Sequence, residues 1–424
     1  MNNHSMDNHC PFDPMSPQVW RNPYPFYAAL RQRKSVAWVE PESRWHLLLG
    51  GGMTSARGFW MLTSFEEISK AMLLADLGHH PPGRAAKQPS VPLPSASGTL
   101  TAIIEDWSLF SDSPEHGRLK RPLARAVARW PFTTLQALAH DVAAKRLEEM
   151  EKRSTFDIVQ DFGDEIPMRV ISTLIGVDEA DHPMLTAWSH ALYAALEFGA
   201  EEDTLQDVDR RLREALDYFR TLLVARRVKP REDLISLLSN AGDGQRLSDD
   251  EILSNCILLL FAGHDTTLNV IGNTARTLLT QPHHLDRFVA KAPDRDDLLE
   301  FLRHESPQQL VFRYALRDFQ ISGQTISEGD LVCLAIGAAN RDPTVFEKPD
   351  DLDFDRRNRQ YLTFGKGIHT CPGSSLGLAI SGASLHVLIP HLARLDAKSW
   401  DWGSNAIMRG LRSLVVSWRT APVA

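Results

Sequence analysis

The chain has 424 residues, of which 43% are hydrophobic and 24% are charged, and its formal net charge is −8. This composition is typical of a soluble globular protein, and the acidic balance argues against nucleic acid as the principal partner. The four cysteines, at positions 10, 256, 333 and 371, have no C-x-x-C spacing, which excludes a zinc ribbon and a dense disulfide framework. Length alone would allow two to three domains.

The N-terminal segment and the length of the apolar runs suggest neither export nor membrane insertion. The first twenty residues contain no basic segment followed by an apolar core, so no secretory signal is expected. The longest apolar run, residues 256–263, is far shorter than the ~20 residues that a membrane span requires. We therefore expect a cytoplasmic protein that does not enter a membrane, with residues 1–20 as a flexible N-terminal segment.

The N-terminal half is predicted to contain short strands followed by many helices. A helix is expected over residues 25–33, and strand-like stretches over 35–39, 46–49 and 58–63. Residues 79–100 are rich in proline, serine and glycine and have no period, which is typical of a lid, a binding loop or disorder. Residues 136–241 are predicted to be overwhelmingly helical.

The clearest predicted element is a long helix that begins at a capping box, in which Ser248 is followed three residues later by Glu251. Its pattern continues to Gln281-Pro282, which gives about 32 residues and a length of roughly 48 Å. After it, the sequence predicts a helix over 297–304, strands within 312–337, an irregular stretch over 340–370 and a helix over 372–392. The fold class is therefore mainly α with small β-sheets, and the lack of alternating βαβ units excludes a doubly wound sheet.

A glycine-rich segment with one cysteine lies directly before the last predicted helix. Within ten residues it contains Phe364, Gly365, Gly367, His369, Cys371 and Gly373. A cysteine at a helix N-terminus feels the positive end of the helix dipole and unpaired N–H groups, which favour the thiolate. The glycines let the backbone turn tightly and approach a flat ligand. Taken alone, the segment fits an iron ligand, a buried structural cysteine or a catalytic nucleophile.

The full pattern F-G-x-G-x-H-x-C-x-G resembles the haem-binding loop of the cytochrome P450 family. The resemblance implies haem b (iron protoporphyrin IX) as the cofactor and Cys371 as the axial thiolate ligand of its iron. It further implies that His369 faces a haem propionate, that Gly365 and Gly373 belong to the cofactor-binding loop, and that Phe364 shields the sulfur.

A second motif lies inside the long helix, at residues 262–267 (AGHDTT). The Thr266 hydroxyl can donate to the carbonyl four residues back, which bends or widens a helix. A carboxylate beside this hydroxyl can relay the two protons that splitting dioxygen needs; the alternative is an ordinary helical aspartate beside a back-bonded threonine. The motif resembles the family's A-G-x-[D/E]-T-T, which implies that Asp265 and Thr266 are the catalytic acid–alcohol pair. His264 is expected on the back face of the helix rather than as a metal ligand.

An E-x-x-R pair at Glu300 and Arg303 places a carboxylate and a guanidinium on one helical face. Such pairs are common on surfaces, but this one precedes the cysteine by about 70 residues and resembles the family's structural pair. The resemblance implies that Arg356 completes the cluster and that its role is fold and haem incorporation.

Three basic residues are implied to bind the haem propionates. Arg313 lies where the family places an arginine after S-P-x-x-x-x-x-R, and residues 113–121 resemble the family's P-E-H-x-x-x-R-R segment. His116 and Lys120 of that segment are four residues apart on one helical face. Lysine stands where arginine is usual, so a bidentate clamp becomes a point charge.

The resemblance extends from Asp13 to Gly410 and implies one triangular, mostly helical domain over residues 1–424, with the long helix crossing over the haem. The implied activity is insertion of one oxygen atom from O2 into a mainly apolar small molecule. The alternatives are a peroxide-driven haem oxygenase and a non-catalytic haem-binding module. No flavin or iron–sulfur segment is fused to the chain, so ferredoxin and ferredoxin reductase are the expected electron donors, and a monomer is expected.

Four arginines at helical spacing form a stripe that is predicted to lie opposite the face of His116 and Lys120: Arg118, Arg121, Arg125 and Arg129. A basic stripe on an acidic protein can steer an acidic ferredoxin, and the alternative is a solvated face without a partner.

The resemblance also implies a substrate pocket roofed by residues 79–105 and by helices around 180–225. Its floor would consist mainly of apolar side chains: Leu258, Phe261, Ala262, Gln309, Leu310, Val311, Ile407 and Met408. Gln308 or Gln309 would either orient a polar group of the substrate or bond to the local backbone.

Overall fold

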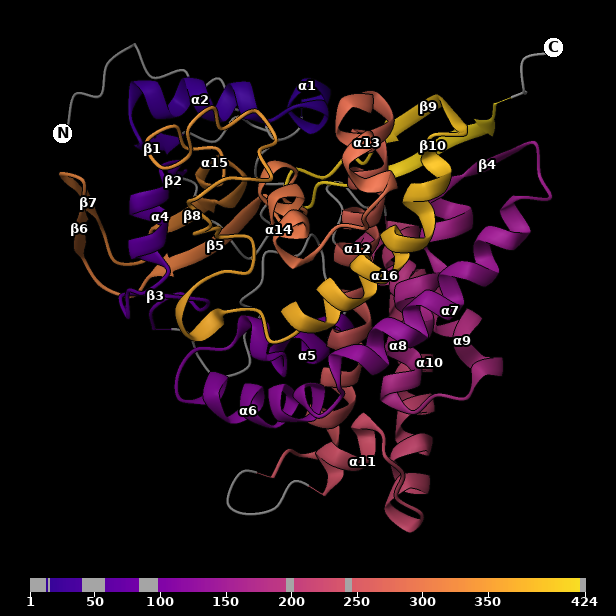
Figure 1. Ribbon diagram of the computed structural model, residues 1–424. Helices are drawn as coiled ribbons and strands as arrows, with labels where there is room; N and C mark the ends of the chain where they lie inside the picture. The colour runs from indigo at the N-terminus through magenta and orange to yellow at the C-terminus, as the bar shows by residue number, and fades with distance from the viewer. Residues whose placement is uncertain are drawn as a thin grey trace.

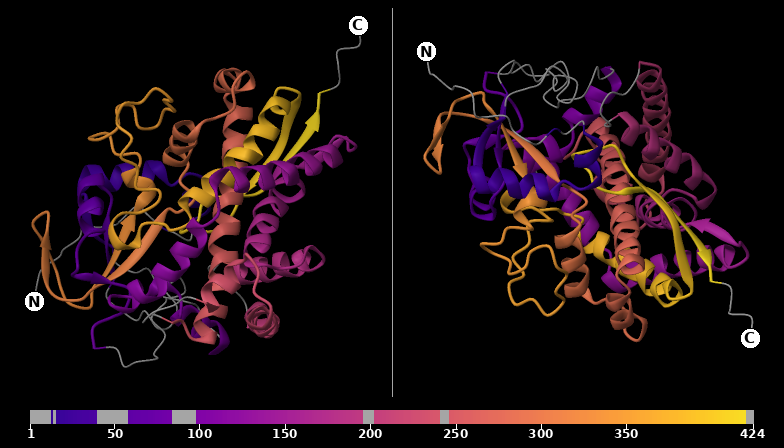
Figure 2. Two further views of the ribbon diagram at one scale, coloured as in Figure 1. Left: turned by 60° about the horizontal axis from the view of Figure 1, so that its bottom comes forward. Right: turned by 90° about the horizontal axis from the view of Figure 1, so that it is seen from above.

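A long central helix separates a β-rich side of the molecule from a helical side (Figure 1). The computed structural model describes residues 13, 16–39, 58–83, 98–195, 202–240 and 246–419. The strand predicted at 46–49 and most of the predicted flexible segment and of the 79–100 loop lie outside these residues. Both views in Figure 2 show the same division around the central helix α12 (Asp249–Thr280).

The central helix has the predicted start and end. Ser248 Oγ accepts from the Glu251 N–H and the Glu251 carboxylate accepts from the Ser248 N–H, so the capping box is formed. The helix spans 32 residues and stops at Gln281, before Pro282 begins the next helix. Most side chains of α12 are buried, because helices pack around it on several sides.

The other helices described are the following: α1 (Pro17–Arg21), α2 (Tyr24–Arg33), α4 (Phe65–Ala71), α5 (Gly98–Glu105), α6 (Glu115–Ala128), α7 (Phe132–Met150), α8 (Glu165–Ile175), α9 (His182–Ala195), α10 (Glu202–Val228), α11 (Leu234–Ser239), α13 (Pro282–Val289), α14 (Arg295–His304), α15 (Ile336–Ala339) and α16 (Ser374–Leu392). Of these, α8, α9, α10 and α16 pack against α12, and α16 also packs against α7. Helix α16 is long and apolar enough to cross a membrane, but 67% of its apolar window is buried inside the protein, so it serves as a core helix.

The main sheet has five strands in the order β1-β2-β8-β5-β3. These strands are β1 (Val36–Val39), β2 (Phe59–Leu62), β3 (Leu77–Gly78), β5 (Leu310–Ala315) and β8 (Leu331–Ala335). Strand β2 pairs with β8 in parallel, and the other neighbours are antiparallel. A two-stranded hairpin of β6 (Phe319–Ile321) and β7 (Gln324–Ile326) turns at Ser322 and Gly323, which both have positive φ.

A three-stranded sheet in the order β4-β10-β9 joins the C-terminal part of the chain to the helical side. Its strands are β4 (Thr155–Asp157), β9 (Leu395–Trp402) and β10 (Leu411–Trp418). The predicted helical run over 136–241 is therefore wrong at β4, since pairing with a strand about 260 residues away leaves no local pattern.

The predicted fold class, mainly α with small sheets, is confirmed. The predicted strands at 35–39 and 58–63 and the strand-rich stretch over 312–337 are present with shifted ends. The last helix begins at Ser374 rather than at residue 372, because Gly373 is its N-cap. Cys256 and Cys333 are fully buried free thiols within the apolar core, as their apolar neighbours predict.

Candidate functional site

The cysteine loop turns tightly just before α16. Gly365 and Gly367 have φ of +71° and +73°, the left-handed region that glycine adopts without strain. The Cys371 N–H donates to the Phe364 carbonyl at 2.8 Å, which closes the loop. Gly373 has an ordinary φ of −92°, so the left-handed part of the turn depends on Gly365 and Gly367 alone. A Cβ at Gly373 would lie 3.9 Å from Cys371 Sγ, which shows how closely the backbone approaches the sulfur.

Two groups favour a negative charge on Cys371, as predicted for a cysteine before a helix, but a third effect opposes them. Burial raises the pKa of the thiol, whereas the Gly373 N–H and the Lys120 ammonium act to lower it, and burial is the larger effect. The groups of the protein alone therefore do not bring the pKa of the Cys371 thiol below its usual value. Coordination to a metal ion deprotonates a thiol outright.

His116 and Lys120 attach α6 to the cysteine loop. The His116 ring lies 2.9 Å through Nδ1 from the Ser108 carbonyl and 3.0 Å through Nε2 from the Ile368 carbonyl. Lys120 Nζ donates to the Thr370 carbonyl at 2.6 Å and also to the Ile368 carbonyl. The His116 and His369 rings lie 4.0 Å apart. Three of the predicted propionate-binding residues thus gather beside the cysteine.

Arg313 and a histidine that the sequence analysis missed complete this basic cluster. Arg313 is buried, which lowers its pKa to about 10. The ring of His79 lies 4.7 Å from that of His369, and its buried Nε2 atom has no hydrogen-bond partner. His79 stands at the start of the proline-rich loop and belongs to no motif, so only its neighbours in space indicate a role.

The basic cluster fits an anionic group. Burial, together with the charges of Arg313, His116 and Lys120, lowers the pKa of His369 to about 3. Burial, followed by the effects of Arg313 and of three histidines, His369, His80 and His116, holds the pKa of His79 well below its usual range. Both histidines therefore stay neutral unless a negative charge lies beside them and the Arg313 guanidinium, and the two propionates of a haem supply such a charge. The cluster and the adjacent Cys371 sulfur together match the donor set of a haem with a thiolate ligand.

Inside α12, Thr266 and Asp265 are arranged as the motif predicts. Thr266 Oγ1 donates to the Ala262 carbonyl at 2.7 Å, the back-bond expected from the sequence. Asp265 is buried, and its Oδ2 atom has no hydrogen-bond partner. Burial raises the pKa of Asp265 to about 6, against the effects of His264 and His190. Asp265 also lines a cavity of about 400 Å³ together with Asp164 and His190.

His264 points away from the cysteine loop, toward α8 and α9. Its ring is fully buried, with Nδ1 3.0 Å from Ser189 Oγ and Nε2 2.9 Å from the Asp164 carbonyl. The expected position on the back face of the helix is therefore confirmed.

Glu300, Arg303 and Arg356 form the buried cluster that the resemblance implies. Arg303 donates from Nε and Nη2 to the two Glu300 oxygens, both at 2.8 Å, and Arg356 Nε lies 3.5 Å from Glu300 Oε1. Arg303 also donates to the carbonyls of Asn340, Pro349 and Asp351. The cluster ties α14 to the irregular stretch before the cysteine loop.

The predicted arginine stripe is only partly correct. Arg118 is half-buried and paired with Glu251 at the start of α12 and with Glu115, so it is not a free surface charge. The pairing holds α6 against α12, which explains why a solvent-exposed position was wrongly predicted. Arg121, Arg125 and Arg129 are exposed, and none of them pairs with a carboxylate among the described residues.

The predicted pocket residues fall into two groups. Leu258, Phe261 and Ala262 lie on α12 within the helical core, where Phe261 stacks on Trp107 at 5.6 Å. The second group joins β5 to the segment before β10, since Gln308 pairs with Met408 and the Gln309 N–H donates to the Ile407 carbonyl at 2.8 Å. Leu310 and Val311 continue this group along β5 and pack in separate apolar clusters.

The two glutamine amides bond to the local backbone. Gln308 Nε2 donates to the Leu310 carbonyl at 2.6 Å, and Gln309 Nε2 donates to the Ser306 carbonyl at 2.7 Å. Gln309 is almost fully buried, and a Cβ at Gly337 would collide with its side chain. Of the two roles considered from the sequence, the structure therefore favours backbone bonding.

Known proteins resemble this chain over nearly its full length. A family model described as Cytochrome P450 matches residues 199–290 and 298–392. The chain is 30% identical over 407 residues to the biotin biosynthesis cytochrome P450 of Bacillus subtilis (strain 168), covering 94% of this chain and 96% of that protein. It is also 30% identical to the polyketide biosynthesis cytochrome P450 PksS of the same organism, covering 96% of this chain and 98% of that protein.

Solved structures show the same fold. The crystal structure of P450BioI in complex with an acyl carrier protein ligated to hexadec-9Z-enoic acid superposes with a TM-score of 0.82 at 28% identity, covering 95% of this chain and 99% of that chain. The structure of PksS from Bacillus subtilis 168 gives a TM-score of 0.83 at 27% identity, covering 96% of this chain and all of that chain. The chain therefore belongs to the cytochrome P450 family of haem-iron monooxygenases and has their single, mainly helical domain.

Proposed function

We propose that this enzyme binds haem b through Cys371 and inserts one oxygen atom from O2 into a mainly apolar organic molecule. The observation that carries the proposal is the buried basic cluster beside Cys371, in which His79 has an unpartnered Nε2 and His369 has a strongly lowered pKa. Such a cluster calls for an anion next to the sulfur. His79, Arg313 and His369 would hold the propionates directly, while His116 and Lys120 are already bonded to backbone carbonyls and would contribute by orienting the loop.

A thiolate-ligated haem iron, when bound, supplies the reduction and cleavage of dioxygen. The protein must then deliver two protons. Asp265 is suited to accept them from water, because its unpartnered Oδ2 is buried and its carboxyl group lines a 400 Å³ cavity. The hydroxyl of Thr266 follows directly along the helix, and its own proton is held by the Ala262 carbonyl at 2.7 Å. The pair therefore provides a short route from the cavity to the α12 face that carries the pocket residues.

An apolar substrate suits the side chains that α12 contributes. The side chains of Leu258, Phe261 and Ala262 are all uncharged. The aromatic ring of Phe261 stacks on Trp107, which holds it in place. A fatty acyl chain, the ligand carried by the acyl carrier protein in the P450BioI structure, has this character. We propose that the substrate class includes such chains, presented free or on a carrier protein.

We propose a ferredoxin-type protein as electron donor. Arg121, Arg125 and Arg129 are exposed along α6, and α6 contacts the cysteine loop through Lys120. An acidic partner attracted to these arginines would dock on the side of the molecule nearest the sulfur, which shortens the path for electrons. The protein is proposed to act as a cytoplasmic monomer.

The first test is the absorption spectrum of the reduced carbon monoxide complex. A red-shifted Soret band in the native enzyme, lost in Cys371→Ser, is expected for a thiolate-ligated haem, and its absence in the native enzyme contradicts the assignment.

A panel of free fatty acids and acyl carrier protein conjugates, scored by displacement of water from the iron, then separates free from carried substrates. Faster native turnover with hydrogen peroxide than with reductant and O2 would favour the peroxide-driven alternative.

A further inference from the structure

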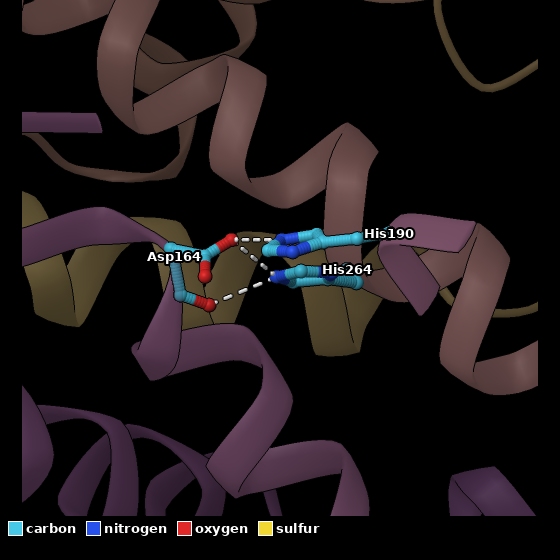
Figure 3. Close-up of side chains that lie close together, drawn as sticks. All are labelled: Asp164, His190 and His264. Carbon is cyan, nitrogen blue, oxygen red and sulfur yellow. Dashed lines mark hydrogen bonds and ion pairs between the residues drawn. The ribbon is translucent and has the colours of Figure 1, made fainter. Parts of the chain in front are cut away.

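Three side chains with metal-binding atoms converge beside α12 (Figure 3). They are Asp164, which is the N-cap of α8, His190 of α9 and His264 of α12. One ligand atom from each lies within 4.8 Å of the other two. His190 Nε2 is 2.8 Å and His264 Nε2 is 3.1 Å from the same carboxylate oxygen of Asp164. The two rings lie side by side with 5.4 Å between their centres.

Two imidazoles and one carboxylate are the ligands that zinc and similar divalent transition metals prefer. With bonds of about 2.0–2.2 Å and tetrahedral angles, such an ion holds its ligand atoms roughly 3.3–3.5 Å apart. The observed separations of 2.8 and 3.1 Å need to open by only about half an ångström. The cluster is therefore close to the geometry of three protein ligands around one ion.

The surroundings hold these side chains close to one another, although His264 Nε2 also lies 2.9 Å from the Asp164 backbone carbonyl, a contact that a bound ion has to replace. Asp164 occupies a helix N-cap, where aspartate usually accepts from a backbone N–H, yet its carboxylate makes no capping bond. Ser189 lies 3.0 Å from His264 Nδ1 and orients the ring so that Nε2 faces Asp164. A hydrogen-bonded second nitrogen of this kind is typical of histidines that bind metals.

An ion can reach the cluster from solvent. The His190 side chain is 52% exposed, and Asp164 is partly exposed. Both line the 400 Å³ cavity, which has room for the water molecules that complete a coordination shell. His264 closes the inner side and is fully buried.

We propose that Asp164, His190 and His264 bind one divalent transition-metal ion, of which zinc(II) is the best match, at a site separate from the haem iron. On binding, the ion takes the lone pair of His264 Nε2, any proton on that nitrogen leaves to solvent, and the neutral ring keeps its proton on Nδ1 toward Ser189 Oγ. This revises the expectation that His264 does not bind a metal.

An ion bound at this site would also affect catalysis. This effect on catalysis rests on the proposed function, whereas the binding of the ion does not. The ion lies at the cavity that Asp265 lines, and Asp265 is the next residue after His264. Occupancy therefore replaces part of the water from which Asp265 would receive protons. Zinc acts as an inhibitor of oxygen-driven turnover, bound at the protein surface and not at the substrate pocket.

Calorimetric titration of the metal-free holoenzyme with zinc chloride tests the site directly, with zinc per protein counted after equilibrium dialysis. One equivalent is expected to bind. His190→Ala removes a ligand at a half-exposed position, and a loss of affinity greater than about 100-fold is expected, beyond the 10–100-fold typical of outer contacts. Ser189→Ala should fall within that 10–100-fold range. Asp164→Asn provides a second ligand variant.

His283→Ala is the matched control, because His283 is exposed and its ring lies 4.0 Å from that of His284. Unchanged binding in His283→Ala and loss in His190→Ala support the site. Absence of binding in the native enzyme, or equal binding in His190→Ala, overturns it whether or not the enzyme oxidises any substrate. Turnover assays then test the consequence: zinc should slow the native enzyme and not His190→Ala, and equal inhibition of both excludes the proposed link to Asp265.

Discussion

Replacing Glu300 by glutamine should strongly destabilise the protein, because it removes the negative charge from a buried cluster of opposite charges. The Glu300 side chain is 1% exposed and accepts from Arg303 twice at 2.8 Å, from the Tyr361 hydroxyl at 3.2 Å and from the Asp353 N–H at 2.9 Å. Glutamine keeps the shape but leaves Arg303 and Arg356, which are 0% and 5% exposed, without a counter-charge.

The expected loss follows from this geometry. Breaking a buried ion pair by removing one partner destabilises by about 3–5 kcal/mol, since the remaining charge is uncompensated. Two buried guanidiniums share this carboxylate, so we expect a value in the upper part of that range. Global stability is about 5–15 kcal/mol, so the loss removes between about a third and nearly all of it, and every 1.4 kcal/mol is a tenfold change in the ratio of folded to unfolded protein.

Urea unfolding, followed by circular dichroism at equal haem content, measures the effect. Glu115→Gln is the matched control, because Glu115 pairs with Arg118 at 2.6 Å but is 57% exposed, and such pairs contribute about 0–1 kcal/mol. A Glu300→Gln variant within 1 kcal/mol of the native enzyme would refute the reasoning. Equal losses in both variants would show that charge removal, rather than burial, determines the effect.

Three further predictions concern catalysis, electron transfer and pH. Asp265→Asn should slow oxygen-driven turnover by about 10²–10⁴-fold, the usual contribution of a proton-transferring group, while peroxide-driven turnover falls much less; equal losses in the two assays would assign Asp265 a merely structural role. Charge reversal at Arg125 and Arg129 should slow reduction by ferredoxin at low salt without changing substrate affinity, and unchanged stopped-flow reduction would exclude the docking face. Burial alone would raise the pKa of the Glu305 carboxyl group. The charges of Arg409 and Arg341 outweigh it and lower that pKa from 4.5 to about 2. The ion pairs of Glu305 therefore stabilise the fold fully above pH 4.5, and acid unfolding should show this contribution being lost as the pH falls from 4.5 toward 2, whereas Glu305→Gln should lack this component.

The sequence predicts the parts of the site that depend on neighbours along the chain. The Thr266 back-bond and the capping box of Ser248 and Glu251 join residues three or four positions apart, so helix geometry alone determines them. The turn at Gly365 depends equally on the local backbone. Motifs extend this success to Glu300 and Arg303, which are also neighbours on one helix turn.

Contacts between distant segments are not predicted in this way. His79 meets His369 only because β3, which His79 directly follows, lies near the cysteine loop in the folded chain. Arg118 has the spacing of a surface residue, but the start of α12 supplies Glu251 as its partner. Strand β4 forms because β10 lies beside it, and neither strand has a signal strong enough to indicate the pairing.

The helical geometry of α12 explains why one short motif connects several environments. Successive residues on an α-helix point about 100° apart. His264 therefore faces Ser189 and Asp164, Asp265 faces the cavity, and Thr266 returns to the Ala262 carbonyl. Three adjacent residues thus join a solvent-facing cluster to the face that carries the proposed substrate pocket. The sequence indicates the chemistry of the acid and the alcohol, whereas the partners of His264 are Ser189 of α9, 75 residues earlier in the chain, and Asp164 at the N-cap of α8, 100 residues earlier. A change on the surface of those helices, at His190 or Asp164, should therefore alter proton delivery without touching the haem-binding loop.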